Sequence, residues 1–250
     1  MESLDVRLRE LIADEVKKLN RPDLFREPLV AVSAADDPRY AQLKTMIGPW
    51  HLEPRELLPD AERVISYFVP FTREVVQDPR RSSGAPAVWG ESYIVLNDYF
   101  DQIGRSVSAL LEGEGYSCFP IAGTHTYDPK DLKSMWSHRS AAAIAGLGAF
   151  GANRMLITEK GSGGRFCTIL TSAPLTVNTE EAEDRCIYHK NGKCGLCFRN
   201  CPVGALKPDG FDRFRCHDTV LLPNAEELKD IGFCDVCGRC ISVCPMAYLE

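Results

Sequence analysis

The sequence predicts a mixed α+β protein in two parts, a cofactor or substrate domain over residues 1–178 and a cysteine-rich domain over residues 179–250. Two observations support this prediction. Strand and helix patterns mix in the first part without the regular strand–helix–strand repeat of a parallel α/β sheet. Nine of the eleven cysteines fall between Cys186 and Cys244. They follow a polar, acidic segment (TVNTEEAEDR) that is typical of a surface linker.

The first half of the N-terminal part predicts two helices and a strand. Residues 1–20 form an amphipathic, charged segment that predicts a helix and lacks the apolar stretch of a signal peptide. Residues 63–71 (RVISYFVPF) are β-branched and aromatic, which predicts a buried strand. Apolar residues from Leu96 to Leu110 keep helical spacing, and Gly113 and Gly115 predict the end of that helix.

The second half predicts a helix followed by two strands. Residues 131–145 (DLKSMWSHRSAAAIA) are expected to be helical up to Gly146. Residues 154–158 and 165–172 flank the turn EKGSGG, which predicts a β-hairpin.

Three glycines between that helix and those strands have the spacing G-x-G-x-x-G, at Gly146, Gly148 and Gly151. They follow a helix and precede a strand, whereas a dinucleotide fingerprint follows a strand and precedes a helix, so we reject NAD binding there. Two interpretations stay open. The glycines either end the helix in a tight turn, or they let the backbone approach a large flat cofactor closely.

Composition narrows the function classes. The net charge of −6 over 250 residues argues against a nucleic-acid partner, because phosphate binding needs a basic surface. No segment approaches the roughly 20 apolar residues of a membrane span, so we expect a cytoplasmic protein without a membrane partner. Cysteines in a reducing compartment indicate metal or redox chemistry instead of disulfides.

A repeated motif indicates what that chemistry is. The pattern C-G-x-C-x-x-x-C-P occurs twice, from Cys194 to Pro202 and from Cys237 to Pro245. A duplicated C-x2-C-x3-C-P is the core of the bacterial two-cluster ferredoxin pattern, in which the last Cys of each run ligates the other cluster. The sequence therefore predicts two [4Fe-4S] clusters and the transfer of single electrons. Zinc is the alternative, because C-x2-C pairs also build zinc ribbons, but the C-P tails favour clusters.

Nine cysteines are available for eight ligand positions. We expect one cluster on Cys186, Cys194, Cys197 and Cys244, and the other on Cys201, Cys216, Cys237 and Cys240. Cys234 is the alternative to Cys216, because it has the standard spacing before the second run.

The order of these motifs resembles a known family. The segments LPDAERVISYFVPF, AAAIAGLGAFGANRMLIT, CGLCFRNCPVGAL, FDRFRC and CGRCISVCP resemble the epoxyqueuosine reductase family, which is related to cobalamin-dependent reductases and reductive dehalogenases. The resemblance implies a nitroreductase-like, corrinoid-binding domain followed by a ferredoxin-like domain. It also implies bound cobalamin, a low-potential electron donor such as ferredoxin or flavodoxin, and a small-molecule or corrinoid ligand. It supports Cys216, because the family has a lone Cys there and no counterpart to Cys234.

The sequence departs from the family at the proton donor. The family has a Gly-Arg-Asp-Tyr-His segment whose Asp is taken as the general acid, and this chain has Gly90-Glu91-Ser92-Tyr93-Ile94. The catalytic candidates are therefore Glu91, Ser92 and Tyr93, and we do not expect reduction of epoxyqueuosine itself. Glu91 also fits a solvated helix carboxylate. The chain ends at Glu250 without the tRNA-binding extension of many members, so we expect weak tRNA binding.

Candidate cofactor contacts surround the glycine segment. They are Gly146, Leu147, Gly148, Gly151, His138 and Arg139. His138 and Arg139 either contact a cofactor phosphate or amide, or cap and solvate their helix. The sequence thus predicts a cobalamin-dependent reductase, with an electron-transfer protein that serves a partner enzyme as the alternative. It sets neither the substrate nor the oligomeric state.

Overall fold

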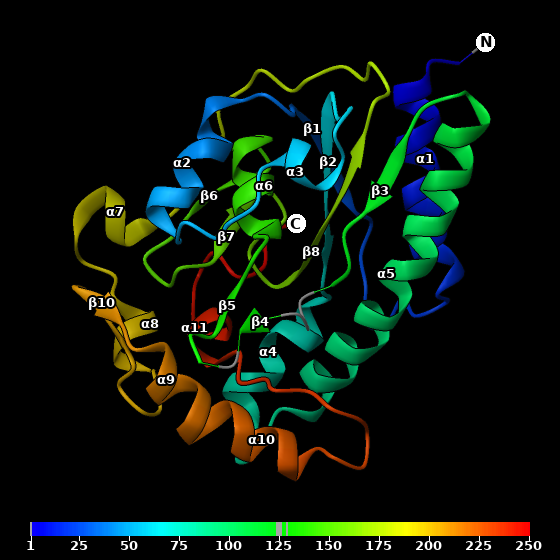
Figure 1. Ribbon diagram of the computed structural model, residues 1–250. Helices are drawn as coiled ribbons and strands as arrows, with labels where there is room; N and C mark the ends of the chain where they lie inside the picture. The colour runs from blue at the N-terminus through cyan, green and yellow to red at the C-terminus, as the bar shows by residue number, and fades with distance from the viewer. Residues whose placement is uncertain (1, 124–126, 129) are drawn as a thin grey trace.

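A four-stranded antiparallel sheet in the order β1-β2-β8-β3 forms the centre of the molecule (Figure 1). The structure is a computed structural model that describes residues 2–123, 127–128 and 130–250. The sheet consists of β1 (Leu29–Ala34), β2 (Arg63–Pro70), β8 (Gly164–Thr171) and the short β3 (Cys118–Pro120).

The central strand β2 is buried on both faces, as its sequence predicts. Ile65 and Tyr67 point toward α1 (Leu4–Lys18) and α5 (Ala87–Gly113), whereas Val64 and Phe68 point toward α6 (His138–Ile144) on the opposite face. This alternation is the two-residue period of a strand. Helices thus cover both faces of the sheet, and the predicted α+β class is confirmed.

The predicted long helix is confirmed as α5. Its residues Leu96, Phe100, Ile103 and Val107 are buried at helical spacing against the sheet. The helix ends at Gly113, and Gly115 (φ 88°) takes the left-handed conformation that turns the chain toward β3. The remaining elements of this part are α2 (Pro38–Met46), α3 (Pro54–Leu57), α4 (Arg73–Arg81), β4 (Tyr127–Asp128), β5 (Lys133–Ser134), β6 (Gly148–Phe150) and β7 (Leu156–Thr158).

Two predictions in this part are wrong. The helix expected over residues 131–145 begins only at His138, because the Ser137 hydroxyl accepts from the N–H of Ser140 and caps α6. The expected hairpin does not form, because β7 pairs with β6 whereas β8 pairs with β2 and β3. Long-range pairing along eight residues of β2 outweighs the local turn signal.

The cysteine-rich part folds as short helices and loops that return to the N-terminal core. Val236 and Ile241 belong to the same buried cluster as α5, and the N–H groups of Ser162 and Gly163 donate to the carbonyl of Ala247. No helix in the described ranges is long and apolar enough to cross a membrane. The elements of this part are α7 (Ile187–Asn191), α8 (Leu196–Arg199), β9 (Leu206–Lys207), β10 (Gly210–Phe211), α9 (Arg213–Cys216), the π-helix His217–Leu221, α10 (Leu222–Glu227) and α11 (Arg239–Ser242).

Candidate metal centres

One set of thiols lines a single pocket. Burial, together with the neighbouring thiolates of the set, raises the pKa of Cys244 to about 11. The same two causes raise the pKa of Cys197. We call these thiols the first set; its members are Cys186, Cys194, Cys197 and Cys244.

A second set lies beside the first. Burial, Cys237 and Cys201 raise the pKa of Cys216 to about 11. Burial, together with the other three members and Cys197 of the first set, raises the pKa of Cys240 to about 12. The two sets therefore adjoin through Cys197 and Cys240. The members of the second set are Cys201, Cys216, Cys237 and Cys240.

The ninth cysteine of this part lies apart from both sets. Cys234 is fully buried beneath α5, where a Cβ added to Gly90 would be 3.1 Å from its Sγ. Burial and the carboxylate of Asp235 raise its pKa, and no other thiol contributes. Cys234 thus packs as a small apolar side chain in the core.

Glycine and backbone N–H groups shape both sets. Gly195 (φ 63°) and Gly238 (φ 67°) follow the first Cys of each run and begin α8 and α11 in the left-handed conformation that favours glycine. Burial raises the pKa of Cys237, whereas a hydrogen bond from the N–H of Arg239 lowers it. The N–H of Ala152 donates to Sγ of Cys186 at 3.4 Å. Donors directed at sulfur stabilise thiolates, which are the form that binds iron.

The thiols surround a space and do not converge on one point. Within the described residues, no three His, Cys, Asp or Glu side chains lie close enough together to hold a single metal ion. Four thiols around one pocket, with N–H donors beside them, are the donor set that a [4Fe-4S] cluster takes.

The predicted glycine segment contacts protein on both sides. Gly146 (φ 80°) ends α6, and a Cβ there would meet the carbonyl oxygen of Glu180 at 2.6 Å. A Cβ on Gly148 would meet the carbonyl oxygen of Ile157 at 2.5 Å, and one on Gly151 would meet Cδ1 of the same residue at 2.7 Å. The segment then reaches the second set, because Nδ2 of Asn153 donates to the carbonyl of Cys240 at 3.4 Å. Sequence reasoning missed Ala152 and Asn153.

A separate cavity of about 570 Å³ lies at the edge of β1, where Gly146 and Leu147 line part of it. Six carboxylates and two guanidinium groups surround it, which is unfavourable for a ligand that carries phosphate. The charged residues are Glu10, Glu27, Glu159, Glu180, Glu181, Glu183, Arg9 and Arg185.

His138 is held inside the fold by hydrogen bonds to both ring nitrogens. Nε2 donates to the carbonyl of Ala122 at 3.2 Å, and Nδ1 accepts from the hydroxyl of Thr168 at 2.7 Å. That hydroxyl accepts in turn from Nε1 of Trp136 at 2.8 Å. Burial lowers the pKa of His138 to about 4, so the ring is neutral. Neither nitrogen is left for a cofactor.

Arg139 lies on the exposed side of α6, between the sheet and the second set. Its guanidinium donates to the carbonyl of Arg154 at 3.3 Å and contacts Sδ of Met155 at 3.2 Å. The surrounding protein and the charge of Arg165 lower its pKa, and the thiolate of Cys240 raises it.

Arg165 joins β8 to α5. Its Nη2 donates to Oδ1 of Asn97 at 2.8 Å, and its guanidinium carbon lies 4.2 Å from the centre of the Tyr93 ring. Arg165 and Asn97 were not predicted as site residues, because they are 68 positions apart in the sequence and meet only when β8 packs beside α5.

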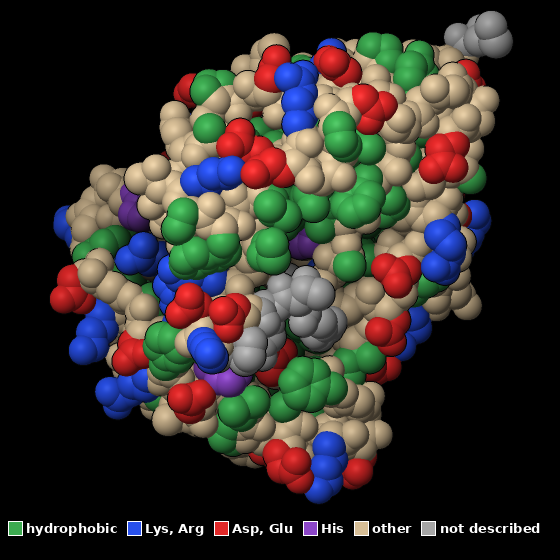
Figure 2. Space-filling view, in the orientation of Figure 1, with side chains coloured by type: hydrophobic (Ala, Val, Ile, Leu, Met, Phe, Trp, Pro, Cys, Tyr) green, Lys and Arg blue, Asp and Glu red, His purple; other side chains and the backbone are tan. Residues whose placement is uncertain are grey.

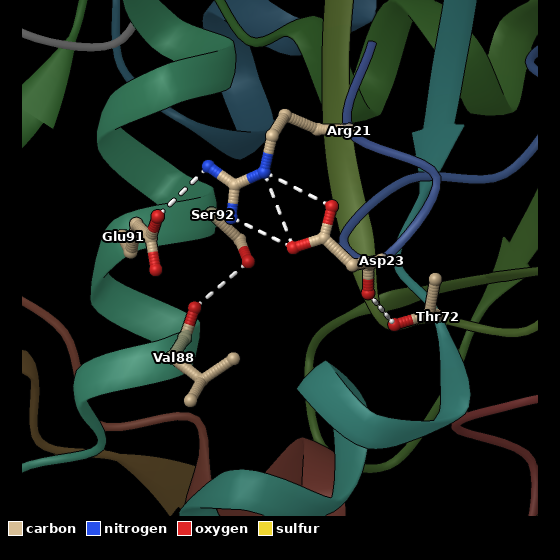
Figure 3. A network of polar contacts seen from close by, with 6 residues as sticks. All are labelled: Arg21, Asp23, Thr72, Val88, Glu91 and Ser92. Carbon is tan, nitrogen blue, oxygen red and sulfur yellow. Dashed lines mark hydrogen bonds and ion pairs between the residues drawn. The ribbon is translucent and has the colours of Figure 1, made fainter.

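Glu91 and Ser92 have other partners (Figure 3). Arg21 donates to the Glu91 carboxylate at 2.8 Å and also contacts Asp23. The hydroxyl of buried Ser92 donates to the carbonyl of Val88 at 2.8 Å, one turn earlier in α5. Of the three catalytic candidates, Tyr93 is the one that the structure places beside the buried cationic group of Arg165.

The comparisons with known proteins agree with the resemblance of the sequence. No family model matches the chain. A curated epoxyqueuosine reductase from Lactococcus garvieae is 28% identical over 208 residues, which are 78% of this chain and 54% of the relative. One from Escherichia coli is 27% identical over 206 residues, which are 79% of this chain and 52% of the relative. The chain is similar to epoxyqueuosine reductases. It spans about half the length of these relatives.

Solved structures show the shared fold. Epoxyqueuosine reductase from Streptococcus thermophilus matches 98% of this chain and 66% of its own, with a TM-score of 0.60 and 18% identity. The catabolic reductive dehalogenase NpRdhA, solved with 3-bromo-4-hydroxybenzoic acid, matches 88% of this chain and 30% of its own, with a TM-score of 0.63 and 17% identity. Another epoxyqueuosine reductase of this fold was solved with a tRNA stem loop. The curated relatives are named for a reductase, which supports the prediction of an enzyme.

Proposed function

We propose that this chain is an iron–sulfur oxidoreductase that passes single electrons through two [4Fe-4S] clusters to a corrinoid in its N-terminal part, where a substrate is reduced. The observation that carries the proposal is the arrangement of the two adjoining thiol sets. Cys197 and Cys240 bring them together, and Asn153 of the glycine segment touches the second one. Electrons that enter either cluster thus have a short path to the glycine segment.

The clusters are assigned to the two sets as grouped above. Cys216 is the eighth ligand, because its thiol interacts with Cys201 and Cys237 whereas that of Cys234 is buried against Gly90. A site for Cys234 would require the segment after α10 to leave the core.

The corrinoid is assigned to the start of β8, where Arg165 interacts with Tyr93 of α5 and with Arg139 of α6. Cationic and neutral side chains suit its phosphate and amide groups better than the acidic cavity at β1 does. When bound, cobalamin supplies a metal centre that accepts single electrons and delivers them to a substrate. His138 would not help to hold the corrinoid, since both its nitrogens are hydrogen-bonded.

Tyr93 is the proton donor of this proposal. Ser92 and Glu91 are engaged with Val88 and Arg21, whereas the Tyr93 ring lies beneath the guanidinium of Arg165, at the place assigned to the corrinoid. Tyr93→Phe is therefore expected to abolish turnover and leave cluster and corrinoid binding intact. Glu91→Gln, two residues away, is the matched control that keeps turnover.

The test is anaerobic purification with iron, sulfide and cobalt analysis. We expect about eight iron atoms and as many sulfides per chain, and a changed visible spectrum on addition of micromolar cobalamin. A chain that contains zinc and no iron would overturn the assignment of [4Fe-4S] clusters. If the clusters are present but no corrinoid binds, the alternative applies, which is an electron-transfer protein that serves a partner enzyme. Ser92, in place of the family's acid, favours this alternative. That alternative is supported if the reduced chain passes electrons to a co-purified enzyme.

A further inference from the structure

We infer that the outer side of the cysteine-rich part is the docking surface for an acidic one-electron carrier protein. The inference rests on the proposed function, because it assigns the place where electrons enter the clusters. The surface, called the basic patch below, consists of Lys193, Arg199, Lys207, Arg213 and Arg215.

The basic patch stands out in an acidic chain. Residues 193–216 contain five Lys and Arg and two carboxylates, Asp209 and Asp212, which gives a local charge of 5 − 2 = +3, against −6 for the whole chain. Acidic segments lie before Arg185 and after Cys216, with four carboxylates and no Lys or Arg at 180–184, and five carboxylates and one Lys at 217–235. Such segregation produces a local positive field that steers a negative partner.

Four of the five cations of the patch are free to meet a partner. Lys193, Arg199, Lys207 and Arg215 are exposed, and they have no ion pair within the described part of the chain. On the helices at the other side of the molecule, by contrast, Arg7 pairs with Glu114 and Lys17 with Asp14.

Two exposed aromatic rings lie within the patch. Phe211 and Phe214 are 44% and 46% exposed. Apolar side chains with a charged rim are the composition of a transient protein interface. Lys and Arg side chains follow the left edge of the molecule in Figure 2, over the place of α8, β10 and α9 in Figure 1.

The position of the patch favours an electron carrier over a nucleic acid. Lys193 precedes Cys194, Arg199 lies between Cys197 and Cys201, and Arg215 precedes Cys216. A protein seated there is within a few residues of both thiol sets. The carrier loses one electron and a cluster gains it, so no bond forms or breaks. The carboxylates of Asp209 and Asp212 interrupt the patch, which disfavours a continuous phosphate backbone.

The test compares two ways of reducing the clusters. Reduced flavodoxin serves as the acidic carrier, and photoreduced deazariboflavin as a small uncharged reductant, in anaerobic stopped-flow experiments. For Lys207→Glu/Arg215→Glu, we expect the second-order rate constant with flavodoxin to fall at least about tenfold at low salt. The difference should vanish at about 1 M salt, where charges are screened within about 3 Å. The rate with deazariboflavin and the iron content stay unchanged.

The control variant is Lys17→Glu/Arg105→Glu, which makes the same charge change on α1 and α5. An equal fall in the control, or no fall in the patch variant, overturns the inference. Lys207→Gln/Arg215→Gln repeats the measurement with a smaller charge change, in case charge reversal lowers the iron content. A tRNA stem loop that binds the wild type but not the patch variant, with flavodoxin rates unchanged, assigns the patch to nucleic acid and also overturns it.

The same data separate this inference from the proposed function. A wild-type chain without iron, or one that deazariboflavin cannot reduce, contradicts the clusters themselves. A wild-type chain that both reductants reduce, with patch variants that behave like it, contradicts the docking surface alone.

Discussion

The two cysteine runs have the same local structure in opposite environments. Gly195 and Gly238 adopt nearly the same left-handed conformation at the start of α8 and α11. A Cβ on Gly195 would meet side-chain atoms of its own run, Arg199 at 3.1 Å and Phe198 at 3.4 Å. A Cβ on Gly238 would meet Pro79 at 2.8 Å and Trp89 at 3.1 Å, which belong to α4 and α5. We call the first run the outer run, because its glycine packs on side chains of its own run. We call the second the inner run, because its glycine packs against α4 and α5.

Hydrogen bonds also tie the inner run to the N-terminal part. Arg239 donates to the carbonyls of Arg80 and Ser82, and the hydroxyl of Ser242 accepts from the N–H of Arg80. The repeated motif thus sets the local geometry of the ligands. The different surroundings of the two runs set the direction of electron flow. In the proposed function, electrons enter at the outer run and leave through the inner one.

The largest effect is expected from removing a ligand. Cys216→Ala should lower the iron content from about eight to about four atoms per chain, because one cluster loses a ligand. Cys234→Ala should keep all the iron and cost about 1 kcal/mol of stability, as an ordinary buried substitution does. Iron and sulfide analysis with electron paramagnetic resonance spectroscopy checks both variants. The assignment fails if Cys234→Ala loses the iron and Cys216→Ala keeps it.

The grouping of the thiols could be predicted because it depends on short spacings. The structure brings together the same two sets of four that the runs and the lone Cys186 and Cys216 indicated, and their ligation of clusters stays a prediction. Strand β2 and helix α5 were predicted because each buries a periodic apolar pattern of its own.

What the sequence missed depends on contacts between distant segments. The pairing of β8 with β2 joins residues about 100 positions apart and removed the expected hairpin. Arg165 meets Asn97 and Tyr93 only once that pairing places β8 beneath α5. His138 looked like a cofactor contact because spacing alone does not show that Thr168 and Ala122 engage both its nitrogens.

The next largest effect is expected on thermal stability, from substitution of Gly195 and Gly238. Each Gly→Ala substitution introduces left-handed strain of about 1–2 kcal/mol. At Gly238 the added methyl group also presses on Pro79 and Trp89, which adds about 1–3 kcal/mol of overpacking. Gly238→Ala should therefore lower the thermal midpoint clearly more than Gly195→Ala does, measured anaerobically with the iron content followed in parallel. Equal shifts would show that the inner run is no more tightly packed than the outer one.

The smallest effect is a change in the pH dependence of stability, and it comes from the buried His138 of α6. Burial lowers the pKa of His138 from 6.5 to about 4, so between these values the unfolded chain binds a proton that the folded chain does not. The free energy of unfolding therefore falls as the pH falls through this window, by at most about 3 kcal/mol, and this contribution levels off below the folded pKa. His138→Gln should flatten the dependence of the thermal midpoint on pH between about 6.5 and 4. His189 is an exposed histidine of α7 that pairs with Asp184. His189→Gln should keep the wild-type slope. If the two variants have the same slope, burial of the neutral His138 ring does not cause the pH dependence.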